Sequence, residues 1–207
     1  MNGTVAWTVP PLTRTIREAL PEEVVRGIID LLEHIEPKVQ ITLEIDGYEF
    51  GSNIPRTPEE LWRVNAATPE MMLTTEAAIA RKPVKIAISR RERGDVSDLA
   101  DAVLRHFGEI AAVFPSDNMT LLSIVSVRAS KSGTLLRLLK PHGILLKTVL
   151  AFGDDVPDID LLSTCGISIA MGNAVPEVIA VADYKTVSND EDGVAVVLEK
   201  MLASSDK

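Results

Sequence analysis

The sequence of 207 residues has little of several things: one cysteine, Cys165, 4% aromatic residues, and no long uninterrupted apolar stretch. One cysteine cannot form a disulfide within the chain, and the apolar runs are too short to cross a bilayer. No signal-peptide pattern is visible in the first residues, so we expect a cytoplasmic location and no membrane partner. With so few aromatic rings, aliphatic side chains must fill the core.

Positive charge is also scarce, since 21 Lys and Arg residues stand against 30 Asp and Glu residues and give a net charge of −9. Nucleic-acid binding draws its affinity from clustered Lys and Arg, so we expect no nucleic-acid partner. A content of 46% hydrophobic and 25% charged residues is typical of a folded chain rather than a disordered one.

The first part of the sequence predicts a small unit of mixed helices and strands. Pro21 begins a helical pattern of apolar residues, and Asp46-Gly47 indicates a tight hairpin turn between strands at 38–45 and 48–50. The elements expected next are helices at 58–64 and 69–81, a strand at 84–88 and a helix at 98–107.

After Pro115 the pattern changes to a regular alternation of strands and helices. We expect strands at 121–127, 148–152 and 167–171, helices at 132–139, 159–162 and 175–182, and a last helix at 193–202. Such alternation predicts a parallel, doubly wound sheet.

The densest chemical signal is the run Phe152-Gly153-Asp154-Asp155-Val156-Pro157-Asp158, where an apolar strand leads directly into three carboxylates. Ligands of open α/β sheets bind beyond the carboxyl ends of the strands, and carboxylate oxygens suit Mg²⁺. The alternative is a helix start whose Asp residues only cap the backbone and complement the helix dipole.

Lys131 lies in Ser130-Lys131-Ser132-Gly133, between a strand and a helix of the same predicted sheet. An ammonium group near carboxylates can neutralise a phosphate dianion and the charge that develops as a phosphoryl group is transferred. The alternative is a solvated surface lysine, and the presence of both loops in one sheet favours the phosphate site.

The sequence from 130 to 194 resembles the C-terminal half of a Cof-type phosphatase of the haloacid dehalogenase-like superfamily. Four stretches carry the resemblance: 130–136, 151–162, 166–174, which includes Met171-Gly172-Asn173-Ala174, and 188–194. The resemblance implies an α/β fold with a doubly wound, parallel (Rossmann-like) core, incomplete at its N-terminal side, and an inserted α/β cap domain. The core would comprise 1–12 and 119–207, and the cap 13–118.

The resemblance also implies roles for particular residues. Lys131 corresponds to the catalytic lysine that contacts phosphate, Asp154 to a Mg²⁺ ligand, Asp158 to the second acidic residue of the metal loop, and Asn173 to a substrate-binding position near that site. Pro157 departs from the family, which usually has Asn there, and its fixed backbone angle puts the loop geometry in doubt.

A larger departure is the missing nucleophile. The family attacks phosphorus with the first Asp of a D-x-D-G-T motif, which we expect upstream of Asn2. Two strings imitate it: Glu44-Ile45-Asp46-Gly47, better interpreted as the hairpin turn, and Asp190-Glu191-Asp192-Gly193, better interpreted as the cap of the last helix.

These observations predict a Mg²⁺-dependent phosphoric-monoester hydrolase that acts on a small phosphorylated metabolite such as a sugar phosphate, with this chain inactive alone. The alternative is a natural non-catalytic protein, derived from a phosphatase, that works through binding or assembly. A phospho-receiver domain is disfavoured because its acidic pair precedes its lysine, whereas Lys131 comes first here. The strand at 148–152 would have an unpaired edge and is a possible surface for self-association.

Overall fold

The computed structural model describes residues 2–8, 15–63, 67–92 and 94–205. Contacts divide the chain into two compact units, Met1–Ala129 and Ser130–Lys207. Within the described ranges, no helix has the length and apolar character needed to cross a membrane.

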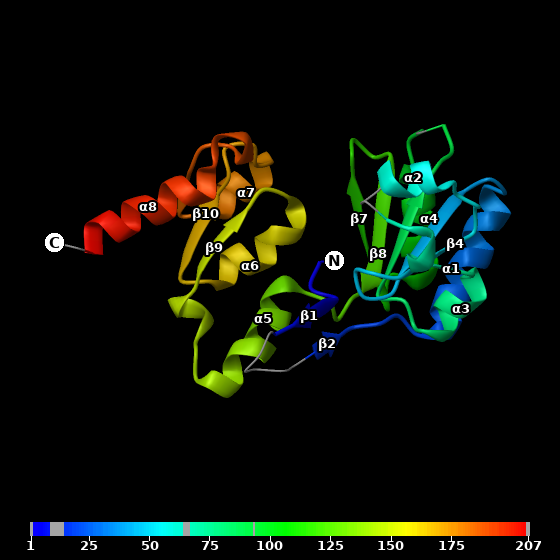
Figure 1. The fold of residues 1–207 in the computed structure, drawn as a ribbon, viewed down its shortest axis with the longest axis horizontal. Coiled ribbons are helices and arrows are strands. Elements are labelled where there is room, and N and C mark those ends of the chain that lie inside the picture. The colour runs from blue at the N-terminus through cyan, green and yellow to red at the C-terminus, as the bar shows by residue number, and fades with distance from the viewer. Residues whose placement is uncertain (1, 9–14, 64–66, 93, 206–207) are drawn as a thin grey trace. The chain divides into compact units, whose positions relative to one another are not determined.

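The first unit is built on a six-stranded sheet with the order β5-β4-β3-β6-β8-β7 (Figure 1). Its strands are β3 (Gln40–Glu44), β4 (Phe50–Ser52), β5 (Met72–Leu73), β6 (Lys85–Ser89), β7 (Ala111–Ser116) and β8 (Leu121–Ser126). All neighbouring strands are antiparallel except β4 and β5, which are parallel.

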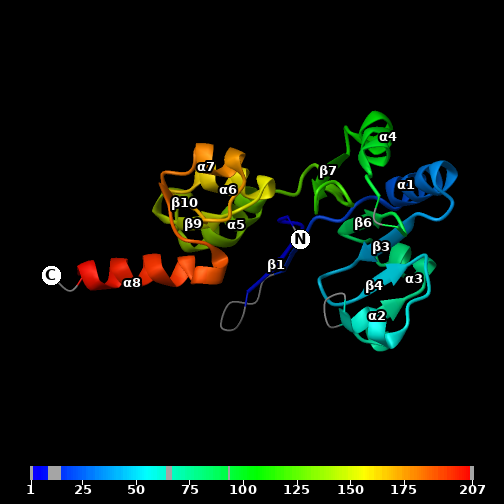
Figure 2. The same cartoon turned by 90° about the horizontal axis from the view of Figure 1, so that it is seen from above.

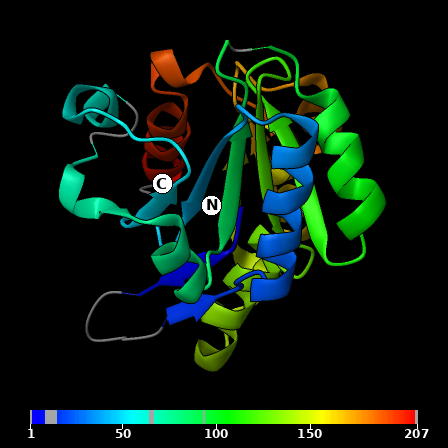
Figure 3. The ribbon, with the colours of Figure 1, turned by 90° about the vertical axis from the view of Figure 1, so that its right-hand side faces the viewer.

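Two long helices, α1 (Glu22–Ile35) and α4 (Ser97–Phe107), pack against one face of this sheet (Figure 3). Strand β3 shows the alternation that produces such a layer, because Ile41 and Leu43 are buried while Thr42 and its other neighbours are only half-buried. Shorter helices, α2 (Pro58–Arg63) and α3 (Thr75–Ala80), and the 3₁₀ turn η1 (Pro69–Met71) complete the unit. Strands β1 (Val5–Trp7) and β2 (Thr15–Arg17) form a separate antiparallel pair.

The second unit contains a three-stranded parallel sheet with the order β11-β10-β9. The strands are β9 (Leu150–Gly153), β10 (Ile167–Ala170) and β11 (Tyr184–Lys185), and the helices are α5 (Lys131–Leu139), α6 (Ile159–Thr164), α7 (Pro176–Val181) and α8 (Gly193–Ser205). Helices α6 and α7 lie on one side of the strands and α8 on the other (Figure 2). The predicted doubly wound, Rossmann-like α/β core is confirmed in this unit.

Several predicted elements are confirmed with small changes in length. The helix that begins after Pro21 is α1, and the Asp46-Gly47 turn joins the antiparallel strands β3 and β4. Gly47 has φ +94°, a left-handed backbone angle that favours glycine.

The predicted helix at 69–81 is wrong, because the segment divides into η1, the short strand β5 and helix α3. Thr74 starts α3 anew: its side-chain oxygen accepts a hydrogen bond from the Ala77 backbone N–H at 3.2 Å.

The strand predicted at 121–127 exists as β8, but its expected place in the parallel sheet is wrong. It pairs antiparallel with β6 and with β7, a strand that the sequence did not reveal. Asp117, Asn118 and Met119 have φ values of 50°, 54° and 64° and turn the chain back between β7 and β8. Pro115 suggested a boundary, yet it lies within β7, an edge strand where proline is tolerated.

The boundary between the two compact units falls between residues 129 and 130, whereas the sequence predicted a domain boundary between residues 118 and 119. Strand β8 and the described residues from 2 to 8 are grouped with the first unit. Residues 9–14, which contain the other predicted boundary, lie outside the described ranges. The assignment of the two units to a cap and a core stays a prediction.

Candidate phosphate and metal site

Lys131 is the first residue of α5, at the point where the chain enters the second unit. Ser130 caps this helix, because its hydroxyl oxygen accepts a hydrogen bond from the Gly133 N–H at 3.0 Å. The cap fixes the first turn of α5 and therefore the start of the Lys131 side chain. The ammonium of Lys131 forms an ion pair with the carboxylate of Asp158.

Asp158 is 7% exposed and lies at the end of a short 3₁₀ turn, η4 (Val156–Asp158), that follows β9. One of its carboxylate oxygens contacts Lys131, and the other accepts hydrogen bonds from the Asp154 N–H (3.1 Å) and the Asp155 N–H (3.3 Å). A buried carboxylate with these three partners is well compensated. Asp158 thus ties the loop after β9 to the first residue of α5.

Gly153 allows this close folding of the loop. A Cβ atom at position 153 would lie 2.5 Å from the Asp158 Cβ and 3.0 Å from a Leu162 methyl group. Real side chains do not approach so closely, so any larger residue at position 153 must displace Asp158.

Asp154 lies on the exposed side of the same loop. Its Oδ2 accepts a hydrogen bond from the Asn173 side-chain amide at 3.0 Å, and its backbone carbonyl accepts one from the Val175 N–H at 2.9 Å. The Asn173 side-chain oxygen in turn accepts a hydrogen bond from the Asn189 N–H at 3.1 Å. Asn173 therefore links the acidic loop to the loop before α8.

The structure brings the four predicted site residues into one hydrogen-bonded group: Lys131 contacts Asp158, Asp158 accepts from the Asp154 backbone, and Asn173 contacts the Asp154 carboxylate. The loops of Asp154 and Asn173 converge because they follow the parallel strands β9 and β10, whose carboxyl ends lie at one edge of the sheet. Lys131 instead follows β8, a strand of the antiparallel sheet, and reaches Asp158 from the start of α5. The roles assigned to these residues remain predictions.

Two further residues in this region were missed by the sequence reasoning. Ser132 donates both its backbone N–H and its hydroxyl to the Asp160 carboxylate, at 2.9 and 2.7 Å. Asp160 lies in the first turn of α6, so this double hydrogen bond joins the starts of α5 and α6. Ser132 follows Lys131 by one residue, and Asp160 follows Asp158 by two. Neither residue type nor this spacing predicts that the two side chains contact each other.

The arrangement offers one carboxylate to a metal ion rather than a ready cluster. No group of three or more His, Cys, Asp or Glu side chains in the described residues is arranged to hold a metal. Both carboxylate oxygens of Asp158 accept hydrogen bonds from protein groups. In Asp154, one carboxylate oxygen accepts a hydrogen bond from Asn173, and the other accepts none from the described residues. Mg²⁺ typically uses one or two carboxylates together with waters and substrate phosphate, so Asp154 fits such a contact.

Pro157 does not prevent this geometry. It stands in the first turn of η4, where its fixed φ is compatible with a helical start. Asp155 and Asp158 still form a reciprocal capping box across the turn, so the loop keeps its hydrogen bonds despite the proline.

The two strings that imitate the nucleophile motif have structural roles. The Asp46 carboxylate accepts a hydrogen bond from the Tyr48 N–H at 3.1 Å within the hairpin turn, which confirms that interpretation. Asp192 has φ 55° and stands between the 3₁₀ turn η5 (Asn189–Glu191) and α8, where its backbone carbonyl accepts a hydrogen bond from the Val196 N–H at 3.1 Å.

Cys165 is buried, and burial raises the pKa of its thiol. A raised pKa keeps the thiol protonated and unreactive near neutral pH.

A family model described as haloacid dehalogenase-like hydrolase matches residues 1–198 of the chain. Among curated proteins, phosphatase YwpJ of Bacillus subtilis is 36% identical over 94 residues, which cover 42% of this chain and 33% of that protein. The chain thus aligns with only about a third of the length of this relative.

Solved structures match over more of the chain. A haloacid dehalogenase-like hydrolase from Bacteroides thetaiotaomicron shares 26% identity with a TM-score of 0.71, covering 91% of this chain and 70% of that one. A subclass IIB sugar phosphatase, BT4131, shares 20% identity with a TM-score of 0.75, covering 97% of this chain and 74% of that one, and at that identity it supports the fold alone.

Proposed function

This chain belongs to the haloacid dehalogenase-like hydrolase family, and on that premise we propose that it forms the phosphate- and metal-binding part of a Mg²⁺-dependent phosphoric-monoester hydrolase. The observation that carries the proposal is the ion pair between Lys131 and the buried Asp158, whose carboxylate also accepts a hydrogen bond from the Asp154 backbone N–H.

Lys131 has the chemistry to contact a phosphate group. Its ammonium is held by Asp158 in a fixed direction, so a phosphate oxygen would meet a cation that is already oriented. In this proposal, Asp158 orients Lys131 and the backbone of the loop after β9. It would therefore act mainly as a positioning residue rather than as the metal ligand that the sequence suggested. Asn173 would orient the Asp154 carboxylate, to which its side-chain amide donates a hydrogen bond, and would also contact a phosphorylated ligand bound there.

Asp154 is the residue that would hold Mg²⁺. When bound, such an ion shields the charge of the phosphate and of the leaving oxygen. The protein's own contribution is the position of the carboxylate, fixed by Asn173 on one side and by the Val175 N–H bond to the backbone on the other.

The chemical step needs a nucleophile, and the 207 residues contain no D-x-D-G-T motif. We propose that the chain binds phosphate but does not hydrolyse esters alone, because positioning groups cannot form the aspartyl-phosphate. The alternative is a non-catalytic binding protein, which also needs no such motif. The two proposals predict different results when a nucleophile segment is added: hydrolysis in the first case, and phosphate binding without hydrolysis in the second.

We propose a small phosphorylated metabolite, such as a sugar phosphate, as the substrate. The support is membership of the haloacid dehalogenase-like hydrolase family. The cytoplasmic location also stays a prediction.

The experiment measures hydrolysis of p-nitrophenyl phosphate with Mg²⁺ by two proteins: this chain and a fusion that places a relative's D-x-D-G-T segment before Asn2. We expect turnover from the fusion only, and its loss in Lys131→Ala. A fusion that folds and binds phosphate without turnover would favour the non-catalytic alternative. Activity of the chain alone that disappears in Asp192→Asn would show that Asp192 is a nucleophile.

A further inference from the structure

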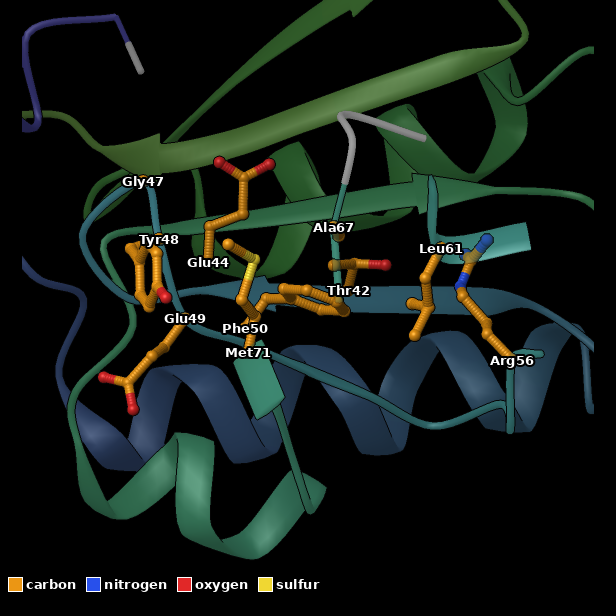
Figure 4. A pocket seen from close by; sticks show the side chains of 10 residues that line it. All are labelled: Thr42, Glu44, Gly47, Tyr48, Glu49, Phe50, Arg56, Leu61, Ala67 and Met71. Atoms are coloured by element: carbon orange, nitrogen blue, oxygen red, sulfur yellow. The ribbon is translucent and has the colours of Figure 1, made fainter. Parts of the chain in front are cut away.

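The first unit contains a partly open pocket of about 140 Å³ beside the β3–β4 hairpin (Figure 4). None of its residues belongs to the loops that carry Lys131 and Asp154. The residues that line it are Thr42, Glu44, Gly47, Tyr48, Glu49, Phe50, Arg56, Leu61, Ala67 and Met71.

Much of the lining is apolar. Phe50, Leu61 and Met71 present a ring, a branched side chain and a thioether to the space, and Leu61 is 2% exposed. A cavity of about 150 Å³ lined by apolar side chains holds one benzene ring, so this pocket has room for a ring-sized body.

The carboxylates that line the pocket are already neutralised. Glu44 pairs with Lys85 at 2.9 Å, and Glu49 accepts a hydrogen bond from Arg81 at 2.9 Å. Arg56 differs: across the ranges that the structure describes, its guanidinium has neither an ion-pair nor a hydrogen-bond partner. Among the described residues that line the pocket, Arg56 therefore carries the one uncompensated positive charge.

Two hydroxyl groups add polar contacts. The side chains of Thr42 and Tyr48 form no hydrogen bond with any described residue, although both line the pocket. Figure 4 shows Arg56 and Leu61 at one end of the pocket, Tyr48 at the other, and Thr42 between them. A ligand along this line would meet the cation first and the apolar lining next.

We propose that this pocket binds a small organic monocarboxylate with a ring-sized apolar body. The carboxylate would pair with the forked guanidinium of Arg56, and the body would pack on Phe50 and Leu61. A single negative charge matches the single uncompensated cation, whereas a phosphate dianion would leave excess negative charge beside Glu44 and Glu49. This binding site goes beyond the proposed hydrolase function and uses none of its residues.

Benzoate is the probe, and benzamide is its neutral counterpart of the same shape. Binding is followed by NMR through the methyl groups of Leu61, Ala67 and Met71 in the whole chain. We expect saturable shifts with benzoate and at least about tenfold weaker binding of benzamide, the loss expected when a charge-assisted pair is replaced.

Arg56→Gln tests the residue itself and should lower benzoate affinity at least about tenfold. Arg91→Gln is the matched control, since Arg91 is exposed and outside the pocket, and it should bind benzoate like the original chain. Thr42→Val keeps the side-chain shape, removes the hydroxyl, and should cost a smaller factor. Unsaturable shifts, equal binding of benzamide, or equal losses in the two arginine variants would overturn the proposal, provided that melting curves show each variant folded.

Discussion

The two units differ in how completely they cover their apolar residues. In the first, a continuous core joins α1 and α4 to four strands of the sheet, and its central side chains, such as Leu43 and Ile86, are fully buried. In the second, the core is smaller, and apolar residues of α8 and of the sheet remain exposed, including Met201 (44%) and Leu202 (69%). The unit with the larger core has none of the proposed phosphate-site residues, whereas the unit with the smaller core carries all four of them.

The larger apolar core and the proposed phosphate site therefore lie in different units of the chain. The site loops need only β9, β10 and the starts of α5 and α6 to converge. The exposed apolar residues of the second unit do not disturb these loops. They do mean that less apolar surface is buried, so the second unit gains less stability from burial than the first.

The strongest expected effect concerns the core of the first unit. Leu43→Ala removes a fully buried side chain from β3 and should destabilise that unit by about 2–5 kcal/mol. Urea unfolding should show this loss in one transition, with the transition of the second unit unchanged. Leu202→Ala, at an exposed position, is the control and should change little. A single transition that both variants shift equally would contradict the separation of the units.

The second prediction concerns the edge of the parallel sheet. Among the described residues β9 pairs only with β10, so its other edge presents backbone groups and the half-buried Leu150. Exposed edges of this kind pair with other chains, and we predict self-association that rises with concentration. Light scattering should show it, and Leu150→Lys should reduce it more than the control Leu145→Lys outside the strand. A chain that stays monomeric at all concentrations would refute it.

The third prediction concerns the bond between Ser132 and Asp160. Asp160→Asn leaves one acceptor for two donors, so the first turn of α5 should lose part of its orientation. We expect inorganic phosphate to bind about threefold more weakly or worse, in line with the loss of one hydrogen bond to a charged group. Ser132→Thr, which keeps the hydroxyl, should bind like the original chain, while Ser132→Ala should follow Asp160→Asn. Unchanged affinity with a lowered melting temperature would assign the bond a structural role only.

The smallest effect is expected from pH. Hydrogen bonds from the Ser168 N–H (2.9 Å) and hydroxyl (2.8 Å) lower the pKa of Asp183. A lowered pKa in the folded state stabilises the second unit above the unfolded Asp pKa of about 3.9, and this contribution is lost as the pH falls through the folded value. Asp183→Asn should therefore flatten the acid limb of the stability curve of that unit. Glu177→Gln is the control, and an equal flattening there would contradict the assignment.

Sequence reasoning anticipated the second unit better than the first. The motif around Gly153 and Asp154 is local, and parallel strands bring their carboxyl ends together whatever the details of the loops. The hairpin of β7 and β8 was missed because its turn places Asp117, Asn118 and Met119 in the left-handed region of backbone angles. None of the three is glycine, the residue that usually indicates such a turn. The Ser132–Asp160 bond and the pairing of both Asp158 oxygens are tertiary contacts, which residue types alone do not specify.

The most direct test of the central claim is an NMR titration of the chain with inorganic phosphate in the presence of Mg²⁺. We predict saturable shifts of the backbone amides of Lys131, Ser132, Asp154 and Asn173, lost in Lys131→Met and retained in the control Lys147→Met. Shifts of the same size in both lysine variants, or saturation confined to residues outside these loops, would contradict a phosphate site at Lys131.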